Sequence, residues 1–384
     1  MDEHRLLVLS DGSVYAGLGF GGPALNLDEL DAVVAPEKSA GEVVFNTAMS
    51  GYHEVLTDAS YTGQLVAMTY PHMGNYGTLH DWSEVGPEGP RPRVGVKAAG
   101  FVIRSLYRGP VPEGRASLHD FLSAGATPGI SEIDTRRLTL SLRNEGTRNG
   151  LILERPGGAE LSAAELERVQ AFLAAFPLME GRNLIGDVGT TEITEVNSGG
   201  RPRIALLDCG AKANIIRELV ALGCAVSVLP SAADATLIRN GGYDALLVSN
   251  GPGDPAVLAQ QVETLKSLVG STPLLGICLG HQLIAEAIGA RTHKMSFGHH
   301  GVNHPVRDEI TRRVFVTSQN HGFAVDEESL PEGAMVWLRN ANDQSVEGLL
   351  DTSRRIRTAQ FHPESAPGPH DSKWIFASFL EMIT

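Results

Sequence analysis

The stretch LLGICLGHQLIA, residues 274–285, changes its hydrophobic pattern at a single cysteine. Residues 272–277 are short and apolar and begin with a turn former, which predicts a buried strand. From Gly280 onward the apolar residues recur at helical spacing. Cys278 is therefore expected on a sharp strand-to-helix turn, flanked by Gly276 and Gly280 as serine is in a G-x-S-x-G nucleophile elbow.

This position suits a thiol nucleophile. The reactive form of cysteine is the thiolate, which the positive end of a helix favours. The N–H of Leu279 would point to the place where an oxyanion forms. Most free cysteines are small buried hydrophobes, and Cys209 and Cys224 are predicted to be core residues of that kind. The flanking glycines favour the catalytic interpretation for Cys278.

Length and composition limit the class of protein. At ~150 residues per domain, 384 residues suggest two domains. The formal net charge of −14 and the lack of a basic stripe argue against a nucleic-acid binder. Three cysteines cannot form a disulfide framework, so a reducing, cytoplasmic location is expected. With no basic signal-peptide region and no run near ~18 apolar residues, no membrane association is expected.

The polar, turn-rich stretch at residues 190–203 indicates the domain boundary. We expect an N-terminal α+β domain over 1–190, a linker over 191–202 and an α/β domain over 203–384. In the latter, strand and helix patterns alternate, which predicts a doubly wound, mostly parallel sheet. The predicted strands are 203–208, 224–230, 243–250, 313–318, 334–339 and 355–361, and the predicted helices are 211–223, 255–270 and 372–383.

The first half has a different pattern. Residues 6–20 predict a β-hairpin, and helical patterns occupy 117–125, 134–146 and 162–176. GPEGPRPR, residues 86–93, predicts a surface loop.

A candidate base lies in QFHPES, residues 360–365. His362 ends a strand-like run, and Pro363 favours an extended backbone before it. Because residues i and i+2 of an extended segment point the same way, Glu364 can reach the imidazole of His362. A histidine before proline is more often structural. With an orienting carboxylate, however, His362 would be the base of a catalytic triad in which Cys278 is the nucleophile.

Two loops could complete the site. SNGPGDP, residues 249–255, follows a predicted strand at the edge of the sheet where ligands bind, and its glycines allow a close approach of backbone to ligand. The same residues also suit an ordinary turn. SQNHGFAV, residues 318–325, presents Asn320, Gly322 and Phe323 between strands but indicates little alone.

GICLGHQ, SNGPGDP, QNHGF and FHPE, in this order, resemble a class I glutamine amidotransferase domain. In addition, residues 41–77 (GEVVFNT to MGNYG), IDTRRLT (133–139) and GHHGVNHPV (298–306) resemble the small, glutamine-hydrolysing subunit of carbamoyl phosphate synthetase. The resemblance covers nearly the whole chain. The stretch formed by residues 22–40 is longer than the resemblance predicts, so the resemblance gives no expectation for the local contacts of this loop.

The resemblance implies that Cys278 is the nucleophile, His362 the base and Glu364 its orienting carboxylate. The amides of Gly251 and Leu279 would form the oxyanion hole. The positions that match those holding glutamine are Ser60, Gly251, Gly253, Leu279, Gln282, Asn320, Gly322 and Phe323. Since Ser60 belongs to the first domain, the active site is expected against the domain interface.

The resemblance also implies an activity and a partner. Glutamine would be split into glutamate and ammonia through a γ-glutamyl thioester, and a large subunit would make carbamoyl phosphate from the ammonia, bicarbonate and ATP. The chain has no phosphate-loop motif, so we expect no cofactor in it and expect ATP and magnesium on the large subunit. The first domain is expected to contact that subunit, in a heterodimer serving arginine or pyrimidine synthesis.

Several alternatives stay open at this point. The chain could serve another synthetase, for guanylate or anthranilate, or be a catalytically silent regulatory relative; the first half argues against the former and the intact Cys, His and Glu set against the latter. His300 and His304 have metal-like spacing but no cysteine or acid cluster beside them, so no metal is expected. Lys212 could face the cleft or be a solvated lysine.

Overall fold

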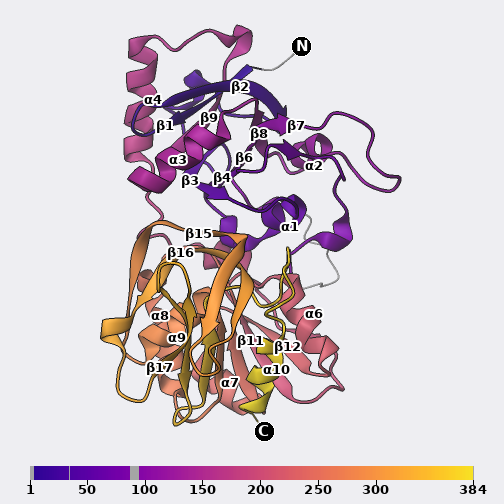
Figure 1. The fold of residues 1–384 in the computed structure, drawn as a ribbon, viewed down its shortest axis with the longest axis vertical. Helices are drawn as coiled ribbons and strands as arrows, with labels where there is room; N and C mark the ends of the chain where they lie inside the picture. The colour runs from indigo at the N-terminus through magenta and orange to yellow at the C-terminus, as the bar shows by residue number, and fades with distance from the viewer. Residues whose placement is uncertain (1–3, 34, 87–94, 384) are drawn as a thin grey trace. The chain divides into compact units, whose positions relative to one another are not determined.

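The computed structural model describes residues 4–33, 35–86 and 95–383, which form two compact units (Figure 1). The first unit runs to Ser83 and resumes from residue 95 to Glu180. The second unit takes residues 84–86 and everything described from Gly181 onward.

The boundary differs from the sequence prediction. The units divide after Glu180, whereas the polar composition of the following stretch predicts a boundary at 190. Residues 191–202 are not a linker, because Thr194–Val196 forms strand β10, which pairs antiparallel with β12 (Ala225–Pro230). An edge strand leaves backbone and side chains in water, so its composition resembles that of a loop.

The first unit is built on a closed barrel with the strand order β1-β2-β8-β6-β4-β3-β9. Its strands are β1 His4–Leu9, β2 Val14–Gly21, β3 Ala40–Asn46, β4 Gln64–Met68, β6 Gly100–Val102, β8 Pro128–Ser131 and β9 Arg148–Glu154, with a separate short pair of β5 His72–Met73 and β7 Ser105–Leu106. Its α-helices are α1 Tyr52–Thr57, α2 Leu118–Ala124, α3 Thr135–Glu145 and α4 Ala163–Ala175. This is the α+β arrangement that the sequence predicts.

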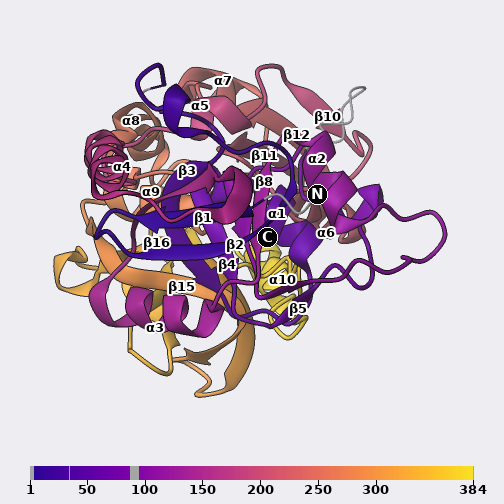
Figure 2. The same cartoon turned by 90° about the horizontal axis from the view of Figure 1, so that it is seen from above.

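Local sequence signals explain these elements. The predicted hairpin is present as β1 and β2, and Gly12 in its turn has a φ of 88°, which favours glycine. Helix α4 begins with a capping box, in which Ser162 and Glu165 each accept the other's backbone N–H. Its apolar stripe, including Val169 and Leu173, packs on β1 and β9 of the barrel (Figure 1), and Figure 2 shows the helix nearly end-on.

The second unit contains a sheet with the strand order β10-β12-β11-β13-β14-β19-β18-β17-β15-β16. The further strands are β11 Arg203–Asp208, β13 Ala245–Val248, β14 Leu274–Ile277, β15 Arg291–Asp308, β16 Val314–Asp326, β17 Met335–Asn340, β18 Val346–Asp351 and β19 Ile356–Ala359. The helices are α5 Ile185–Val188, α6 Ala213–Ala221, α7 Ala235–Asn240, α8 Ala259–Leu268, α9 Leu279–Ala287 and α10 Trp374–Glu381. Strands β12, β11, β13, β14 and β19 run parallel, as predicted.

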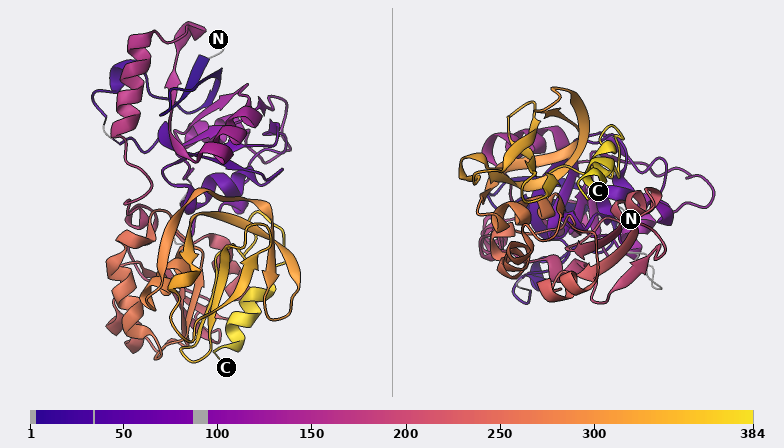
Figure 3. Two further views of the ribbon diagram at one scale, coloured as in Figure 1. Left: turned by 60° about the vertical axis from the view of Figure 1, so that its left-hand side comes forward. Right: turned by 90° about the horizontal axis from the view of Figure 1, so that it is seen from below.

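Alternate residues of the parallel strands point into two separate hydrophobic cores, one on each face of the sheet. Leu206 and Leu247 face α6 and α10, whereas Leu207 and Leu246 face α7, α8 and α9. Because both faces are covered by helices, these strands are apolar throughout, which is typical of a doubly wound α/β sheet. Figure 3 shows the C-terminal helix α10, in yellow, beside the strands that it covers.

Beyond β19 the sheet continues with antiparallel strands. The long pair β15–β16 places the GHHGVNHP and QNHGF segments opposite each other, with His299 across from His321 and His300 across from Asn320. Two motifs that are distant in sequence therefore meet on one pair of strands.

Within the described ranges, no helix is both long and apolar enough to cross a membrane. The predicted surface loop at 86–93 lies outside the described residues except for Gly86.

Candidate active site

Cys278 lies between β14 and α9, at the strand-to-helix turn that the sequence predicts. Its φ of 53° and ψ of −105° fall in a region that non-glycine residues rarely occupy, so the turn is strained. Strand β14 is paired in parallel with β13 on one side and β19 on the other. The turn therefore holds the thiol at the carboxyl edge of the parallel sheet, where such sheets bind ligands.

The two glycines that flank Cys278 are required by close packing. A Cβ added to Gly280 would lie 2.1 Å from the carbonyl oxygen of Val248, and one added to Gly276 would lie 2.7 Å from the backbone of Gly280. Since real Cβ atoms do not approach so closely, the helix could not begin so near the sheet with larger residues. The glycines thus make the tight elbow possible.

The predicted oxyanion donors follow two neighbouring parallel strands, β13 and β14. Leu279 is the first residue of α9, so its N–H has no acceptor within the helix. Gly251 follows β13, and a Cβ added to it would be 2.9 Å from Cδ2 of Leu279. The neighbouring amide of Cys278 is used in the sheet, where it donates to the carbonyl of Ala359 at 2.9 Å.

His362 and Glu364 make the contact that their spacing predicts. Nδ1 of His362 lies 2.6 Å from Oε1 of Glu364, and both side chains are almost completely buried. The backbone N–H of His362 donates to the carbonyl of Ser318 at 2.8 Å, which fixes this segment beside β16. The other ring nitrogen, Nε2, is the one left to interact with the thiol of Cys278, because Nδ1 is taken by Glu364.

In the pair of His362 and Glu364, each charged group favours the charged form of the other. Burial alone would lower the pKa of His362, but the charge of Glu364 and hydrogen bonding to Cys278 and Glu364 raise it to about 10. Burial alone would raise the pKa of Glu364, but the charges of Lys212 and His362 lower it to about 2. The imidazole is thus held as a cation beside the thiol at neutral pH.

Lys212 is a member of this site that the sequence leaves undecided. Its side chain is 2% exposed, and its Nζ lies 2.9 Å from Oε1 of Glu364 and donates to the carbonyl of Ala366 at 2.5 Å. The side-chain amide of Asn214, in α6, also donates to the backbone carbonyl of Glu364. Burial raises the pKa of Glu84 to about 8, and the charge of Lys212 opposes that rise. Lys212 is therefore a buried counter-ion and not a solvated lysine.

Three of the predicted glutamine-binding residues are connected to Cys278 through hydrogen bonds. The carbonyl of Asn320 accepts from Sγ of Cys278 at 3.5 Å, and its side-chain oxygen lies 2.8 Å from Nδ1 of His300. Gln282, on α9, donates its Nε2 to the carbonyl of Phe323 at 3.0 Å. The elbow helix and the 320–323 segment are thus bonded together.

The other predicted positions are less closely connected. Gly253 has a φ of 98° and bridges to Asn183, which is a structural reason for glycine there. Gly322 leaves room for Lys294, whose Nζ would be 2.8 Å from an added Cβ. Ser60 lies in the first unit, where its N–H donates to Oδ1 of Asp58 at 2.9 Å. A role in holding glutamine stays a prediction for these residues.

A second buried cluster was not predicted from the sequence. His299, His321 and Glu347 have ligand-type atoms that all lie within 4.8 Å of one another. The histidines that the sequence offers as metal candidates behave differently, since His300 bonds to Asn320 and His304 is not in this cluster.

The first site combines a strained thiol, a charged imidazole, an orienting carboxylate and the backbone N–H at the start of α9. A thiol with a paired histidine can attack a carbonyl carbon, and amides at a helix start can stabilise the oxyanion that forms. The geometry thus suits acyl transfer through a thioester.

Comparisons with known proteins agree in both halves of the chain. Residues 7–152 match the family described as carbamoyl-phosphate synthase small chain, CPSase domain, and residues 205–382 match glutamine amidotransferase class-I. The carbamoyl phosphate synthase small chain of Methanopyrus kandleri is 42% identical over 98% of both chains. That of Thioalkalivibrio sulfidiphilus is 41% identical over 98% of this chain and 97% of the relative. The crystal structure of a glutamine amidotransferase from Thermotoga maritima is 15% identical, with a TM-score of 0.38 over 47% of this chain and 97% of that one.

Proposed function

Because this chain belongs to the carbamoyl phosphate synthase small chain family, we propose that it hydrolyses L-glutamine at Cys278 and delivers the ammonia to a large subunit. The amidotransferase match over residues 205–382 supports glutamine hydrolysis as the general role. The large subunit would combine the ammonia with bicarbonate and ATP to make carbamoyl phosphate for arginine or pyrimidine synthesis.

In the proposed reaction, the thiolate of Cys278 attacks the side-chain amide carbon of glutamine, and the carbonyl electrons move onto oxygen. The N–H groups of Gly251 and Leu279 stabilise that oxyanion. His362 gives a proton to the leaving nitrogen, the C–N bond breaks, and ammonia departs from a γ-glutamyl thioester. A water molecule that loses its proton to His362 then attacks the thioester, which releases glutamate and regenerates the thiolate.

The observation that carries this proposal is the buried His362–Glu364 contact of 2.6 Å behind a strained cysteine. Glu364 keeps the imidazole charged, which suits His362 to protonate the leaving group. A silent regulatory relative would gain nothing from burying two charged groups, because their desolvation is costly.

The partner and its cofactors complete the proposal. The sequence has no phosphate-loop motif, so ATP and magnesium are proposed to bind the large subunit. The first unit is the part that matches the small-chain family outside the amidotransferase domain, and we assign it the contact with the large subunit. Cys209, Cys224 and Cys278 are all unpaired, which agrees with a reducing cytoplasm.

Glutaminase assays of the purified chain, with and without the large subunit, test this proposal. Free ammonia would be wasted, so the lone chain should hydrolyse glutamine slowly, and the complex should turn over faster when ATP and bicarbonate are present. This is a coupling between two sites. A lone chain that works at the full rate of the complex, or that hydrolyses ATP itself, would contradict the dependent role.

A further inference from the structure

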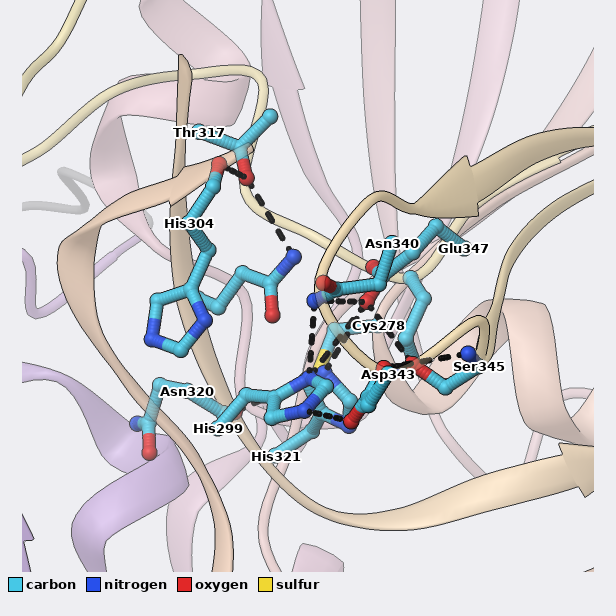
Figure 4. A network of polar contacts seen from close by, with 12 residues as sticks. Cys278, His299, His304, Thr317, Asn320, His321, Asn340, Asp343, Ser345 and Glu347 are labelled. Carbon is cyan, nitrogen blue, oxygen red and sulfur yellow. Dashed lines mark hydrogen bonds and ion pairs between the residues drawn. The ribbon is translucent and has the colours of Figure 1, made fainter. Parts of the chain in front are cut away.

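The second buried cluster joins residues of three strands, β15, β16 and β18. His299 on β15 is paired with His321 on β16, and Glu347 lies on β18. The two rings meet edge to face with centroids 4.9 Å apart, and Asp343 lies beside them (Figure 4). The side chains of His299, His321 and Glu347 are 5%, 1% and 0% exposed, so the cluster has little access to water.

The hydrogen bonds of the two histidines determine which nitrogen of each ring faces Glu347. Nε2 of His299 lies 2.7 Å from Oδ2 of Asp343, so it carries the proton and leaves the lone pair on Nδ1. Nδ1 of His321 lies 2.9 Å from the carbonyl of Phe323, so it carries the proton and leaves the lone pair on Nε2. Nδ1 of His299, which is also 3.5 Å from Nδ2 of Asn340, and Nε2 of His321 lie 3.4 and 3.9 Å from Oε1 of Glu347.

This arrangement is typical of histidines that bind metals. Such a histidine donates its second ring N–H to a carboxylate or a backbone carbonyl, which orients the ring and fixes the tautomer. Asp343 is such a partner for His299, and the carbonyl of Phe323 is one for His321. Asp343 is held in turn by the N–H and the hydroxyl of Ser345.

Nδ2 of Asn340 donates to Oε1 of Glu347 at 3.3 Å, but two other acceptors of the cluster have no donor among the described residues. Among the residues that the structure describes, neither Nε2 of His321 nor Oε2 of Glu347 has a hydrogen-bond partner. Burying such groups unpaired costs about 1–3 kcal/mol each, and more for a charged carboxylate. A cation at the centre would satisfy both atoms at once.

We propose that His299, His321 and Glu347 bind one zinc-type divalent cation. Two imidazole nitrogens and one carboxylate, with a fourth position open, are a donor set that Zn²⁺ accepts. Tetrahedral bonds of about 2.0–2.1 Å place ligand atoms about 3.3–3.5 Å apart. The two nitrogens lie 3.4 and 3.9 Å from the carboxylate oxygen, and all three ligand atoms lie within 4.8 Å of one another, so the side chains must contract around the ion.

The surface offers the cation a way in. The side chain of Asp343 is 44% exposed, and it lines a cavity of about 520 Å³ together with Ser345, Val346 and His293. An ion that enters there meets the carboxylate of Asp343 before it reaches the buried histidines. Asp343 thus joins the bulk solvent to the cluster.

Bound metal would stiffen the segment that follows Asn320. The carbonyl of Phe323 accepts from both His321 and Gln282, so one ligand of the cation is bonded to the elbow helix α9. The cation would act as a structural centre for residues 320–323. Its binding does not depend on the proposed glutaminase activity.

The test measures metal directly on the full chain, purified without a histidine tag and without chelators. Elemental analysis should find about one zinc-type ion per chain. Chelated protein should take up Co²⁺ with the visible bands of a four- or five-coordinate nitrogen and oxygen site, and added Zn²⁺ should raise the thermal unfolding temperature.

Variants separate this site from adventitious binding. Glu347→Gln keeps the shape of the side chain but removes the charged ligand, and should weaken Co²⁺ binding at least 100-fold by order of magnitude. Asp343→Asn should weaken it about 10–100-fold and is a safe second variant, because Asp343 is partly exposed. Glu328→Gln, at an exposed position outside the cluster, should bind as the wild type does.

The proposal is overturned if Co²⁺ binds the wild type, Glu347→Gln and Asp343→Asn with the same low affinity, whether or not the purified protein carries metal. In that case a proton on His299, shared with the two carboxylates, holds the cluster together. A Zn²⁺-induced rise in unfolding temperature that persists in Asp343→Asn and Glu347→Gln would equally exclude the site.

Discussion

Lys212→Met should destabilise the protein strongly, because it removes one of the two cations, Lys212 and His362, that contact the buried carboxylate of Glu364. The two side chains are 2% and 0% exposed and lie 2.9 Å apart. Removing one partner of a buried pair typically costs about 3–5 kcal/mol in the free energy of unfolding. Lys266→Met is the matched control: its pair with Glu263 is 63% and 71% exposed, so it should cost less than about 1 kcal/mol.

The double variant makes this prediction specific. Lys212→Met combined with Glu364→Gln removes both charges, so it should cost clearly less than the sum of the two single changes. Urea unfolding of the four proteins at pH 7 gives the free energies. If the cost of the double variant equals the sum of the two single costs to within about 0.5 kcal/mol, the two groups do not interact and the role given to Lys212 is wrong.

The remaining predictions concern the imidazole and the elbow. His362→Asn removes the proton carrier and should reduce glutamine turnover about 10²–10⁴-fold in steady-state kinetics, whereas wild-type turnover would remove the triad from the mechanism. Because the pKa of His362 is raised to about 10 from an ordinary 6.5, its contribution to stability is complete below pH 6.5 and is lost as the pH rises through 10. The wild type should therefore lose more stability than His362→Asn between pH 7 and 10 in urea titrations, and equal losses would contradict the raised pKa. Gly280→Ala places a methyl group 2.1 Å from the carbonyl of Val248 and should cost about 1–3 kcal/mol or more, which unfolding measurements check; a neutral effect would show that the elbow has room to relax.

Local patterns predicted those parts of the site that depend on neighbouring residues. The strand, the turn and the helix around Cys278 follow from six or so adjacent residues whose periodicity changes at a glycine. The contact between His362 and Glu364 follows from the period of an extended chain, which needs no knowledge of the rest of the fold. The alternating pattern of the second half likewise predicted the parallel sheet.

Features that depend on distant pairing were not predictable in this way. Lys212 follows β11 and Glu364 follows β19, and composition alone does not reveal that the two chain segments meet. His299 and Glu347 face each other only because β15, β17 and β18 adopt one particular register, in which bulges interrupt the pairing. The strand β10 was mistaken for a linker because a short edge strand has the composition of a loop.

The most direct test of the central claim is to trap isotopically labelled glutamine on the protein and to map the covalent adduct by mass spectrometry of its peptides. The account predicts a γ-glutamyl thioester on the peptide that contains Cys278, and predicts that Cys278→Ser forms no adduct and hydrolyses no glutamine while its complex still uses added ammonia. An adduct on Cys209 or Cys224, or undiminished hydrolysis by Cys278→Ser, would contradict the account.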